Sequence, residues 1–345
     1  MLKLSKRQLK ILEFIRGQNG ASNLEIRKYL KNISRVTIFR ELNIMLKNGL
    51  IEPVGKGRSI RYREKAGNEL GQYIDVGQYF KKSPDERQLA STRFNFELFK
   101  NLKDIFSPVE LTELKNFNLK YQNRVKKLSA TILKKEFERL TIELSWKSSR
   151  IEGNTYSLID TEVLIKEHKE ASGHQREEAT MILNHKKAFD YILDKASDFK
   201  NLNFYKITNI HNLVTEDLGV AKGLRQKIVG IVGTRYKPLD NEHQIREMMQ
   251  QTIKIINRTK DPFSKAVLAI LILSYIQPFE DGNKRTARLL GNAILLAHKV
   301  CPLSYRSINE ADYKKAMILF YEQNNFRFFK ELFVKQFKFA VDNYF

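Results

Sequence analysis

The segment 277–288, QPFEDGNKRTAR, holds the residues of this chain that are best suited to chemistry. Asp281 and Gly282 form a tight turn that opens onto a predicted helix, and the N–H groups at a helix N-terminus bind anions such as phosphate. Arg285 and Arg288 follow three residues apart, so both guanidinium groups lie on one face of that helix. Because Mg²⁺ takes one or two carboxylates together with phosphate oxygens, Asp281 is a candidate metal ligand. The segment therefore predicts a site for a di- or triphosphate.

Two apolar helices are predicted to position this loop. Residues 264–276 are apolar almost all round, as in a fully buried helix, and Pro278 ends that helix. Residues 283–300 carry apolar side chains at helical spacing and predict a second buried helix. The alternative is a plain helix–helix corner, in which Asp281 and the arginines only cap and pair.

The segment resembles the signature of Fic (Fido) domain proteins, His-Pro-Phe-x-Asp/Glu-Gly-Asn-Gly/Lys-Arg-x-x-Arg, with Gln277 in the place of the histidine. The matching residues are Pro278, Phe279, Asp281, Gly282, Asn283, Lys284, Arg285 and Arg288. Residues 148–153 (SSRIEG) resemble the inhibitory-helix motif Ser/Thr-x-x-x-Glu-Gly/Asn of the subclass with an N-terminal inhibitory helix. Residues 223–238 resemble the β-hairpin flap that holds a target's side chain. The resemblance covers roughly residues 130–340.

This resemblance implies transfer of AMP from ATP to a Ser, Thr or Tyr hydroxyl of a target protein. It implies that Asp281 binds Mg²⁺, that Arg285 holds the α- and β-phosphates, and that Arg288 holds the γ-phosphate. It further implies that residues 282–284 form the anion nest and that Asn283 braces the loop.

The resemblance also implies an inhibitory helix near residues 145–155. Glu152 would reach Arg288 and pair with it, so that ATP does not seat productively. The charge logic is general, because an arginine already paired to a carboxylate is a poorer ligand for phosphate. The alternative interpretation of Glu152 is an ordinary carboxylate at a helix end.

Gln277 departs from the family pattern where the chemistry is most demanding. Attack on the α-phosphate requires a base to remove the proton of the target hydroxyl, and a glutamine amide cannot take it at neutral pH. Loss of a general base typically costs about 10²–10⁴ in rate, while binding survives. Among the six histidines of the chain, His211 and His243 are those that could approach the site in space.

Lys284 is a milder departure. A lysine here resembles the Doc-type branch, whose members transfer phosphate from an inverted nucleotide, whereas Arg288 and Glu152 resemble the adenylylating branch. Three functions therefore stay open. They are a self-inhibited protein adenylyltransferase impaired by Gln277, a nucleotide-sensing DNA-binding transcriptional regulator that is a pseudoenzyme, and an enzyme that removes AMP with water positioned by Glu152.

Residues 1–65 form a separate basic module, with 16 Lys and Arg against 5 Glu, a net charge of +11. Helices are predicted over 5–17, from Ser22, and over 34–48 with Asn48 and Gly49 closing the last, followed by a hairpin over 50–54 and 59–62. This order resembles the winged helix-turn-helix domain of bacterial transcription regulators. The resemblance implies that the residues facing DNA are Arg35, Thr37, Arg40, Lys56, Arg58 and Arg61. A protein-binding winged helix and a plain solvated basic surface are the alternatives.

The composition of the chain limits its number of domains, its cysteine chemistry and its expected location. The chain has 345 residues and a net charge of +22, which allows two or three domains and predicts attraction to polyanions. The single Cys301 excludes a disulfide framework and a cysteine-based zinc cluster. No signal peptide or membrane span is recognised, so we expect a cytoplasmic protein without membrane partners.

The fold class expected is mainly α, with strands only in the wing and the flap. We expect a winged helix-turn-helix domain over 1–65, a helical connector over 66–129 and a Fic domain over 130–345. The expected cofactors and partners are Mg²⁺, ATP, a protein hydroxyl and DNA, and a homodimer stays open.

Overall fold

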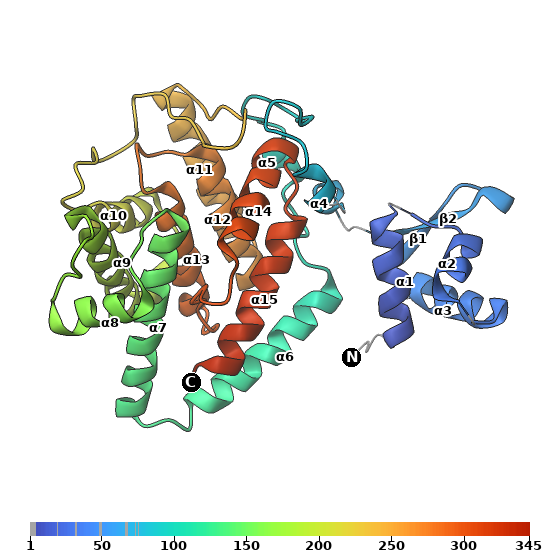
Figure 1. Cartoon of the computed structure of the whole chain (residues 1–345), viewed down its shortest axis with the longest axis horizontal. Helices are drawn as coiled ribbons and strands as arrows, with labels where there is room; N and C mark the ends of the chain where they lie inside the picture. Colours follow the sequence, from blue (N-terminus) through green and yellow to red (C-terminus); the bar gives the residue numbers. More distant parts are fainter. Residues whose placement is uncertain are drawn as a thin grey trace. The chain divides into compact units, whose positions relative to one another are not determined.

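The structure, a computed structural model, divides into two compact units, residues 1–81 and 82–345, called the N-terminal and the C-terminal unit below. Each unit is described by itself (Figure 1). The residues that the structure describes are 5–18, 20–31, 33–47, 50–65, 68–72, 74 and 76–345. None of the described helices combines the length and the apolar character needed to cross a bilayer.

Short helices and a hairpin make up the described part of the N-terminal unit. They are α1 (Lys6–Gly17), α2 (Asn23–Leu30), α3 (Arg35–Lys47), β1 (Ile51–Val54), the 3₁₀ turn η1 (Gly57–Ser59), β2 (Arg61–Glu64), η2 (Glu69–Gly71) and α4 (Val76–Tyr79). Ser5 and Ser22 begin α1 and α2 with capping boxes, which satisfy N–H groups that the first turn leaves unpaired. β1 and β2 are antiparallel, with Ile51 opposite Glu64.

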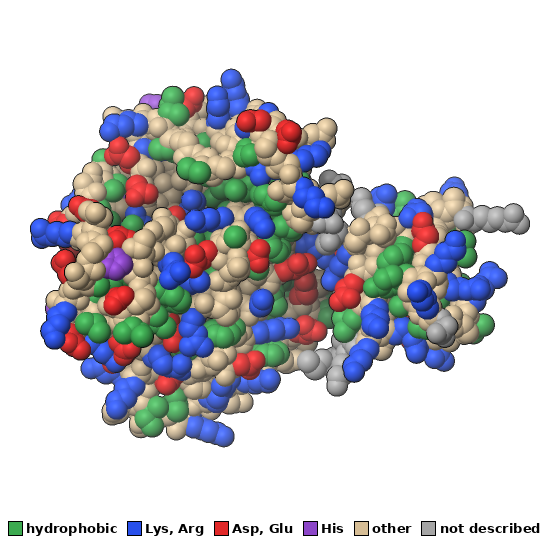
Figure 2. Space-filling model, in the orientation of Figure 1, with side chains coloured by type: hydrophobic (Ala, Val, Ile, Leu, Met, Phe, Trp, Pro, Cys, Tyr) green, Lys and Arg blue, Asp and Glu red, His purple; other side chains and the backbone are tan. Residues whose placement is uncertain are grey.

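The predicted helices and hairpin of this unit are present in the predicted order. The second strand begins at Arg61 rather than at Ser59, because residues 57–59 form the 3₁₀ turn η1. Asn48 and Gly49, predicted to close the third helix, lie outside the described residues. The three helices bury Ile15, Ile26 and Ile38 in one core, each with no exposed surface. Lys and Arg side chains are numerous on the visible surface of both units (Figure 2).

The C-terminal unit is helical. Its described elements are α5 (Leu98–Asn101), α6 (Pro108–Val125), α7 (Ala130–Ile151), α8 (Leu158–Glu167), α9 (Arg176–Asp194), η3 (Ala196–Lys200), α10 (Phe204–Val214), α11 (Glu242–Arg258), α12 (Pro262–Ile276), α13 (Asn283–Ala297), α14 (Glu310–Gln323) and α15 (Arg327–Asn343). α12 lies in the middle of the unit, with α11, α13 and α14 packed around it (Figure 1).

The predicted pair of buried helices forms the centre of this unit. Of the 15 residues of α12, 14 are buried, as its all-round apolar sequence predicts. α13 ends at Ala297, three residues before the predicted end. The two helices approach closely at Gly291, where a Cβ would lie 2.6 Å from Cδ1 of Ile270. This close approach fixes the direction in which α13 leaves the loop that joins the helices.

Residues 223–238, predicted to be a β-hairpin flap, contain no strand. Lys237 makes an isolated parallel bridge to Arg93 instead of pairing within the segment. The ring of Tyr236 is buried near the end of the segment, but the side chains of Ile228 and Val232 in its middle are 77% and 96% exposed and pack against no apolar surface. An isolated hairpin without such packing is marginal in water. The prediction of strands in this flap is therefore wrong.

The segment predicted as a helical connector, residues 66–129, is divided between the two units. Residues 82–107 are mostly irregular around the short α5, whereas α6 is a full helix that lies along α15 (Figure 1). Lys330 donates to the carboxylate of Glu110 at 2.7 Å between these two helices.

The contact at Gly291 yields a stability prediction. In Gly291→Ala the new methyl group meets the fully buried Ile270, and overpacking of this kind costs about 1–3 kcal/mol. That cost exceeds the gain of at most about 1 kcal/mol in helix propensity. We therefore expect a lower free energy of unfolding in urea denaturation. Gly230→Ala is the control, because a Cβ there meets nothing within 4 Å. Equal stability of the two variants would contradict the packing argument.

Candidate functional site

The loop between α12 and α13 is shaped by two residues with positive φ. Gln277 ends α12 in the left-handed conformation (φ 51°, ψ 60°), and its N–H bonds the carbonyl of Leu273 at 3.1 Å. Gly282 precedes α13 with φ 76°. A Cβ at Gly282 would lie 2.8 Å from Cγ2 of Thr215, so both its backbone angle and its surroundings require glycine.

Side chains brace the loop from both sides. Asn283 accepts a hydrogen bond from the N–H of Phe279 at 2.9 Å and donates to its carbonyl at 2.8 Å. The ring of His211 stacks on Phe279, with 3.8 Å between the centroids. Burial lowers the pKa of His211, so the imidazole is neutral and its Nε2–H donates to the carbonyl of Asp281 at 2.9 Å. The loop is thereby held rigid before any ligand binds.

Arg285 carries the first positive charge of the site. Its side chain is 3% exposed, and one Nη2–H donates to Oδ2 of Asp281 at 2.9 Å. Its Nη1 is buried and has no hydrogen-bond partner among the described residues. Burial lowers the pKa of Arg285, and Asp281 partly offsets this effect. No side chain caps the first turn of α13 at Gly282. The unpaired N–H of Arg285 and the uncapped N–H groups of α13 therefore both lie in the first turn of this helix.

Arg288 carries the second charge and is fully buried. Its Nη1 lies 2.8 Å from Oε1 of Glu152, the residue at the C-terminal end of α7. Its Nε and Nη2 donate to the hydroxyl and the carbonyl of Ser148 at 2.9 and 2.8 Å. Nζ of Lys284 lies 3.6 Å from the other oxygen of Glu152. The end of α7 therefore occupies Arg288 and attracts Lys284.

The pair between Glu152 and Arg288 keeps both groups ionised. Burial alone would raise the pKa of Glu152, but Arg288 and Lys284 hold it below its usual range. Burial alone would lower the pKa of Arg288, but Glu152 raises it above its usual value. Both shifts favour the charged forms, as expected for opposite charges in contact.

The side chain of Gln277 is not suited to transferring a proton. Its side chain is nearly buried, and its Nε2 donates to the carbonyl of Ser274 at 2.6 Å. Its own backbone carbonyl accepts from Nε of Arg225 at 2.6 Å, and the N–H of Arg225 bonds the carbonyl of Pro278 at 3.0 Å. Arg225 thus ties the start of the 223–238 segment to the loop. The amide at Gln277 offers hydrogen bonds but no base.

The histidines do not replace the missing base. His211 lies at the loop, as the sequence analysis allowed. Its ring, however, donates a hydrogen bond to the backbone carbonyl of Asp281. His243 lies exposed on the first turn of α11. His185, on α9, is fully buried, and its pKa is lowered well below the usual value by burial and by the nearby Arg288 and Arg285. His185 stays neutral, and solvent does not reach it.

The structure brings most of the predicted residues of the C-terminal unit to one place. Around the α12–α13 loop lie Glu152, Gln277, Asp281, Gly282, Asn283, Lys284, Arg285 and Arg288. Ser148, His185 and Tyr313 belong to the site and were not predicted. Tyr313 lies on α14, with the guanidinium of Arg288 over its ring at 5.4 Å. Only Ser148 carried a signal, as the first residue of the SSRIEG motif.

A metal ion would need ligands from outside the protein. No cluster of three or more His, Cys, Asp or Glu side chains suited to a metal occurs in the described part of the chain. The side chain of Asp281 is 68% exposed, and one of its oxygens is bonded to Arg285. Asp281 alone fits Mg²⁺ only together with phosphate oxygens.

In the N-terminal unit the predicted basic residues differ in their surroundings. Arg35 and Arg40 are exposed on α3, and Lys56 is exposed in the hairpin turn. The guanidinium of Arg61 lies 3.0 Å from Glu25, and the hydroxyl of Thr37 lies 2.9 Å from that of Ser34. The side chain of Arg58 lies outside the described part of the structure.

The family match found by comparison with known proteins lies in the C-terminal unit. Residues 201–295 match the Fic/DOC family model. The chain is 26% identical over 171 residues to the Caenorhabditis elegans "Protein adenylyltransferase fic-1", covering 47% of this chain and 33% of that protein. It is 25% identical over 185 residues to the Nematostella vectensis "Protein adenylyltransferase Fic", covering 52% of this chain and 43% of that protein. The match thus spans less than half the length of these relatives.

A solved structure shares the fold. The structure titled "Fic-1 (aa134 - 508) from C. elegans" matches with a TM-score of 0.57 and 20% identity, covering 68% of this chain and 70% of that one. The helices α10 to α12, the loop described above and α13 up to residue 295 fall within the segment that matches the family model. The C-terminal unit therefore carries a domain of the Fic/DOC family.

Proposed function

We propose that the C-terminal unit binds ATP with Mg²⁺ and acts as a protein adenylyltransferase that Glu152 restrains and Gln277 impairs. The proposal rests on a difference in the hydrogen bonding and ion pairing of the two arginines. Arg285 holds a buried, unpartnered N–H beside the uncapped end of α13, whereas Arg288 is already paired. The relatives named protein adenylyltransferase support AMP transfer as the reaction.

The nucleotide is assigned to the N-terminus of α13. The first amide groups of α13, at residues 283 and 284, and the free N–H of Arg285 suit the α- and β-phosphates. Asp281 would hold Mg²⁺, which neutralises part of the phosphate charge when it is bound. Arg288 suits the γ-phosphate once it is free of Glu152.

Inhibition follows from competition for one guanidinium. Glu152 and the γ-phosphate are both anions that require Arg288, and a guanidinium this deeply buried has no second open side. ATP must displace the carboxylate or bind without a γ-phosphate contact. The ion pair of Glu152 with Arg288 and Lys284 therefore opposes productive binding.

The chemical step lacks a proton acceptor. A target hydroxyl attacks the α-phosphorus, a new P–O bond forms, and the bond to pyrophosphate breaks. The hydroxyl proton must leave in the same step, and the amide of Gln277 does not accept it. Without a base at position 277 the proton passes to water, so we expect slow transfer.

Charge removal at Glu152 gives the first test of this proposal. In Glu152→Gln, Arg288 loses its charge partner, so we expect a lower melting temperature without nucleotide. We also expect the dissociation constant of MgATP to fall about tenfold, or about 1.4 kcal/mol, by isothermal titration calorimetry. Glu162→Gln is the control, because Glu162 pairs with Lys166 on the surface of α8, away from Arg288. Unchanged ATP affinity in Glu152→Gln would refute the inhibitory role.

Restoring a base gives the second test. We expect Glu152→Gln with Gln277→His to transfer label from α-³²P-ATP to protein about 10²–10⁴ times faster than Glu152→Gln alone. Gln277→Asn in the same background is the control, since it retains an amide. Equal labelling by the single and the double variant would show that Gln277 is not the block. Absence of MgATP binding in every variant would remove the nucleotide site.

A DNA-binding nucleotide sensor is the second candidate function. The observation that favours it is the pair of exposed arginines on α3, Arg35 and Arg40, together with the exposed Lys56. Such residues suit the phosphates and base edges of a duplex when a helix lies in the major groove. In this interpretation the C-terminal unit binds a nucleotide without turnover.

Salt dependence tests the DNA interaction. We expect the full chain to shift a mixed-sequence duplex at low salt, with an affinity that falls steeply as salt rises. Arg35→Ala and Arg40→Ala should each weaken binding and reduce the slope of log K against log salt by about 1. Lys10→Ala, which removes an exposed charge from α1, is the control. No shift of any duplex at low salt would refute DNA binding.

A further inference from the structure

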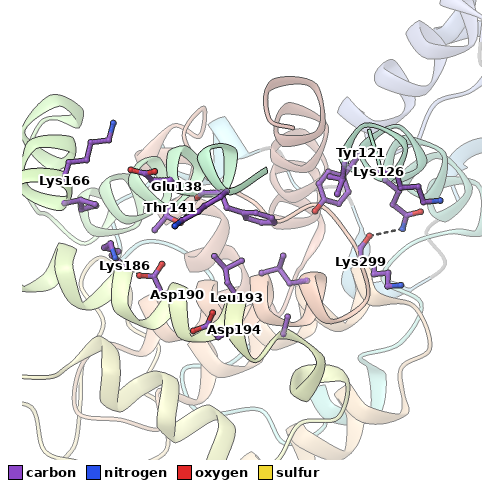
Figure 3. A pocket seen from close by; sticks show the side chains of 17 residues that line it. Tyr121, Lys126, Glu138, Thr141, Lys166, Lys186, Asp190, Leu193, Asp194 and Lys299 are labelled. Atoms are coloured by element: carbon purple, nitrogen blue, oxygen red, sulfur yellow. Dashed lines mark hydrogen bonds and ion pairs between the residues drawn. The ribbon is translucent and has the colours of Figure 1, made fainter. Parts of the chain in front are cut away.

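A cavity lies in the C-terminal unit between α6, α7, α8, α9 and α13 (Figure 3). Its volume is about 1220 Å³, above the usual 300–1,000 Å³ of pockets that hold small molecules. None of the residues that line it belongs to the α12–α13 loop or to the end of α7 at Glu152. The cavity is therefore separate from the proposed nucleotide site.

The floor of this cavity is apolar. Phe137 from α7, Ile165 from α8, Leu193 from α9 and Leu296 from α13 contribute to it. Each of these residues except Ile165 is only partly buried, so apolar surface stays open to the cavity. Covering such surface with an apolar ligand is favourable by about 25 cal/mol per Å². The floor therefore suits the apolar body of a ligand.

The rim of the cavity is positive, and its two ends differ. At one end Lys166 pairs with Glu162 at 2.7 Å, and Lys186 pairs with Asp190 at 2.6 Å. At the other end Lys126 and Lys299 lie beside Tyr121 (Figure 3).

The lysines at this second end are the ones available to a ligand. Lys126 and Lys299 are exposed and make no ion pair within the described chain. Lys134, a further lining residue from α7, is likewise exposed and without an ion pair in the described chain. The amide of Gln122 donates to the backbone carbonyl of Lys299 at 2.9 Å, a contact that does not involve the ammonium group. A negative group between Lys126 and Lys299 would therefore meet positive charge that no acidic side chain of the described chain pairs.

We propose that this cavity binds an amphipathic monoanion, with an apolar chain along Phe137 and Leu193 and a carboxylate between Lys126 and Lys299. A linear molecule suits the arrangement, because Leu193 of the apolar floor lies between the paired lysines and the unpaired ones (Figure 3). The acidic residue Asp194 lies closer to the paired lysines than to Lys126 and Lys299, so it would repel the head group from that side and set its direction (Figure 3).

Titration calorimetry with decanoate on the full chain, below the micelle concentration, tests the site. We expect saturable binding of one decanoate per chain and at least tenfold weaker binding of the neutral n-decanol. Equal affinity for decanoate and n-decanol would overturn the role of the lysines, and absence of saturable decanoate binding would overturn the site.

Paired variants locate the head group. We expect the Lys126→Ala, Lys299→Ala double variant to bind decanoate at least tenfold more weakly. The control is Lys127→Ala with Lys135→Ala, which removes two neighbouring lysines that do not line the cavity. Leu193→Glu, which places a negative charge on the floor, should abolish binding. Melting curves monitor folding, and wild-type affinity in both the lysine pair and Leu193→Glu would overturn the assignment.

Discussion

The buried guanidinium of Arg288 is the charge around which the Fic/DOC domain is organised. A positive group with no exposed surface requires hydrogen-bond acceptors and a negative partner, and no single helix supplies them. α7 contributes Ser148 and Glu152, and α14 contributes the ring of Tyr313. Because the charge must be matched, these helices meet α13 at one defined place. The same requirement makes the site responsive, since any anion that reaches Arg288 competes with a contact within the protein.

The loop and the ion pair of Glu152 with Arg288 are formed by different kinds of contact. Asn283, Phe279 and Gly282 lie within a few residues of one another and form a rigid turn from local contacts. The contact of Glu152 with Arg288 joins segments far apart in the chain and depends on how α7 packs. A local turn persists while a distant helix end moves. We therefore expect the groups proposed to bind phosphate to keep their positions whether or not the carboxylate of Glu152 is paired with Arg288.

Much of this site could be predicted from the sequence, because its signals are local. The apolar run of α12, the proline that ends it, the glycine of the turn and the spacing of Arg285 and Arg288 all act within one segment. Glu152 was predicted through the family motif, not through its own surroundings. His185 and Tyr313 carried no signal, because their place depends on the packing of α9 and α14. The flap was predicted as strands through the family resemblance, but a strand needs a partner and a packed face, which the sequence of 223–238 does not reveal.

The left-handed backbone at Gln277 has a consequence at the level of the gene. Histidine adopts this conformation more readily than most residues, whereas glutamine has no such preference. A histidine at position 277 can therefore adopt the same backbone conformation as the glutamine. Glutamine and histidine codons share their first two bases, so a change of the third base exchanges one for the other. A single base change therefore exchanges glutamine and histidine at position 277, and the backbone conformation at this position accepts either residue.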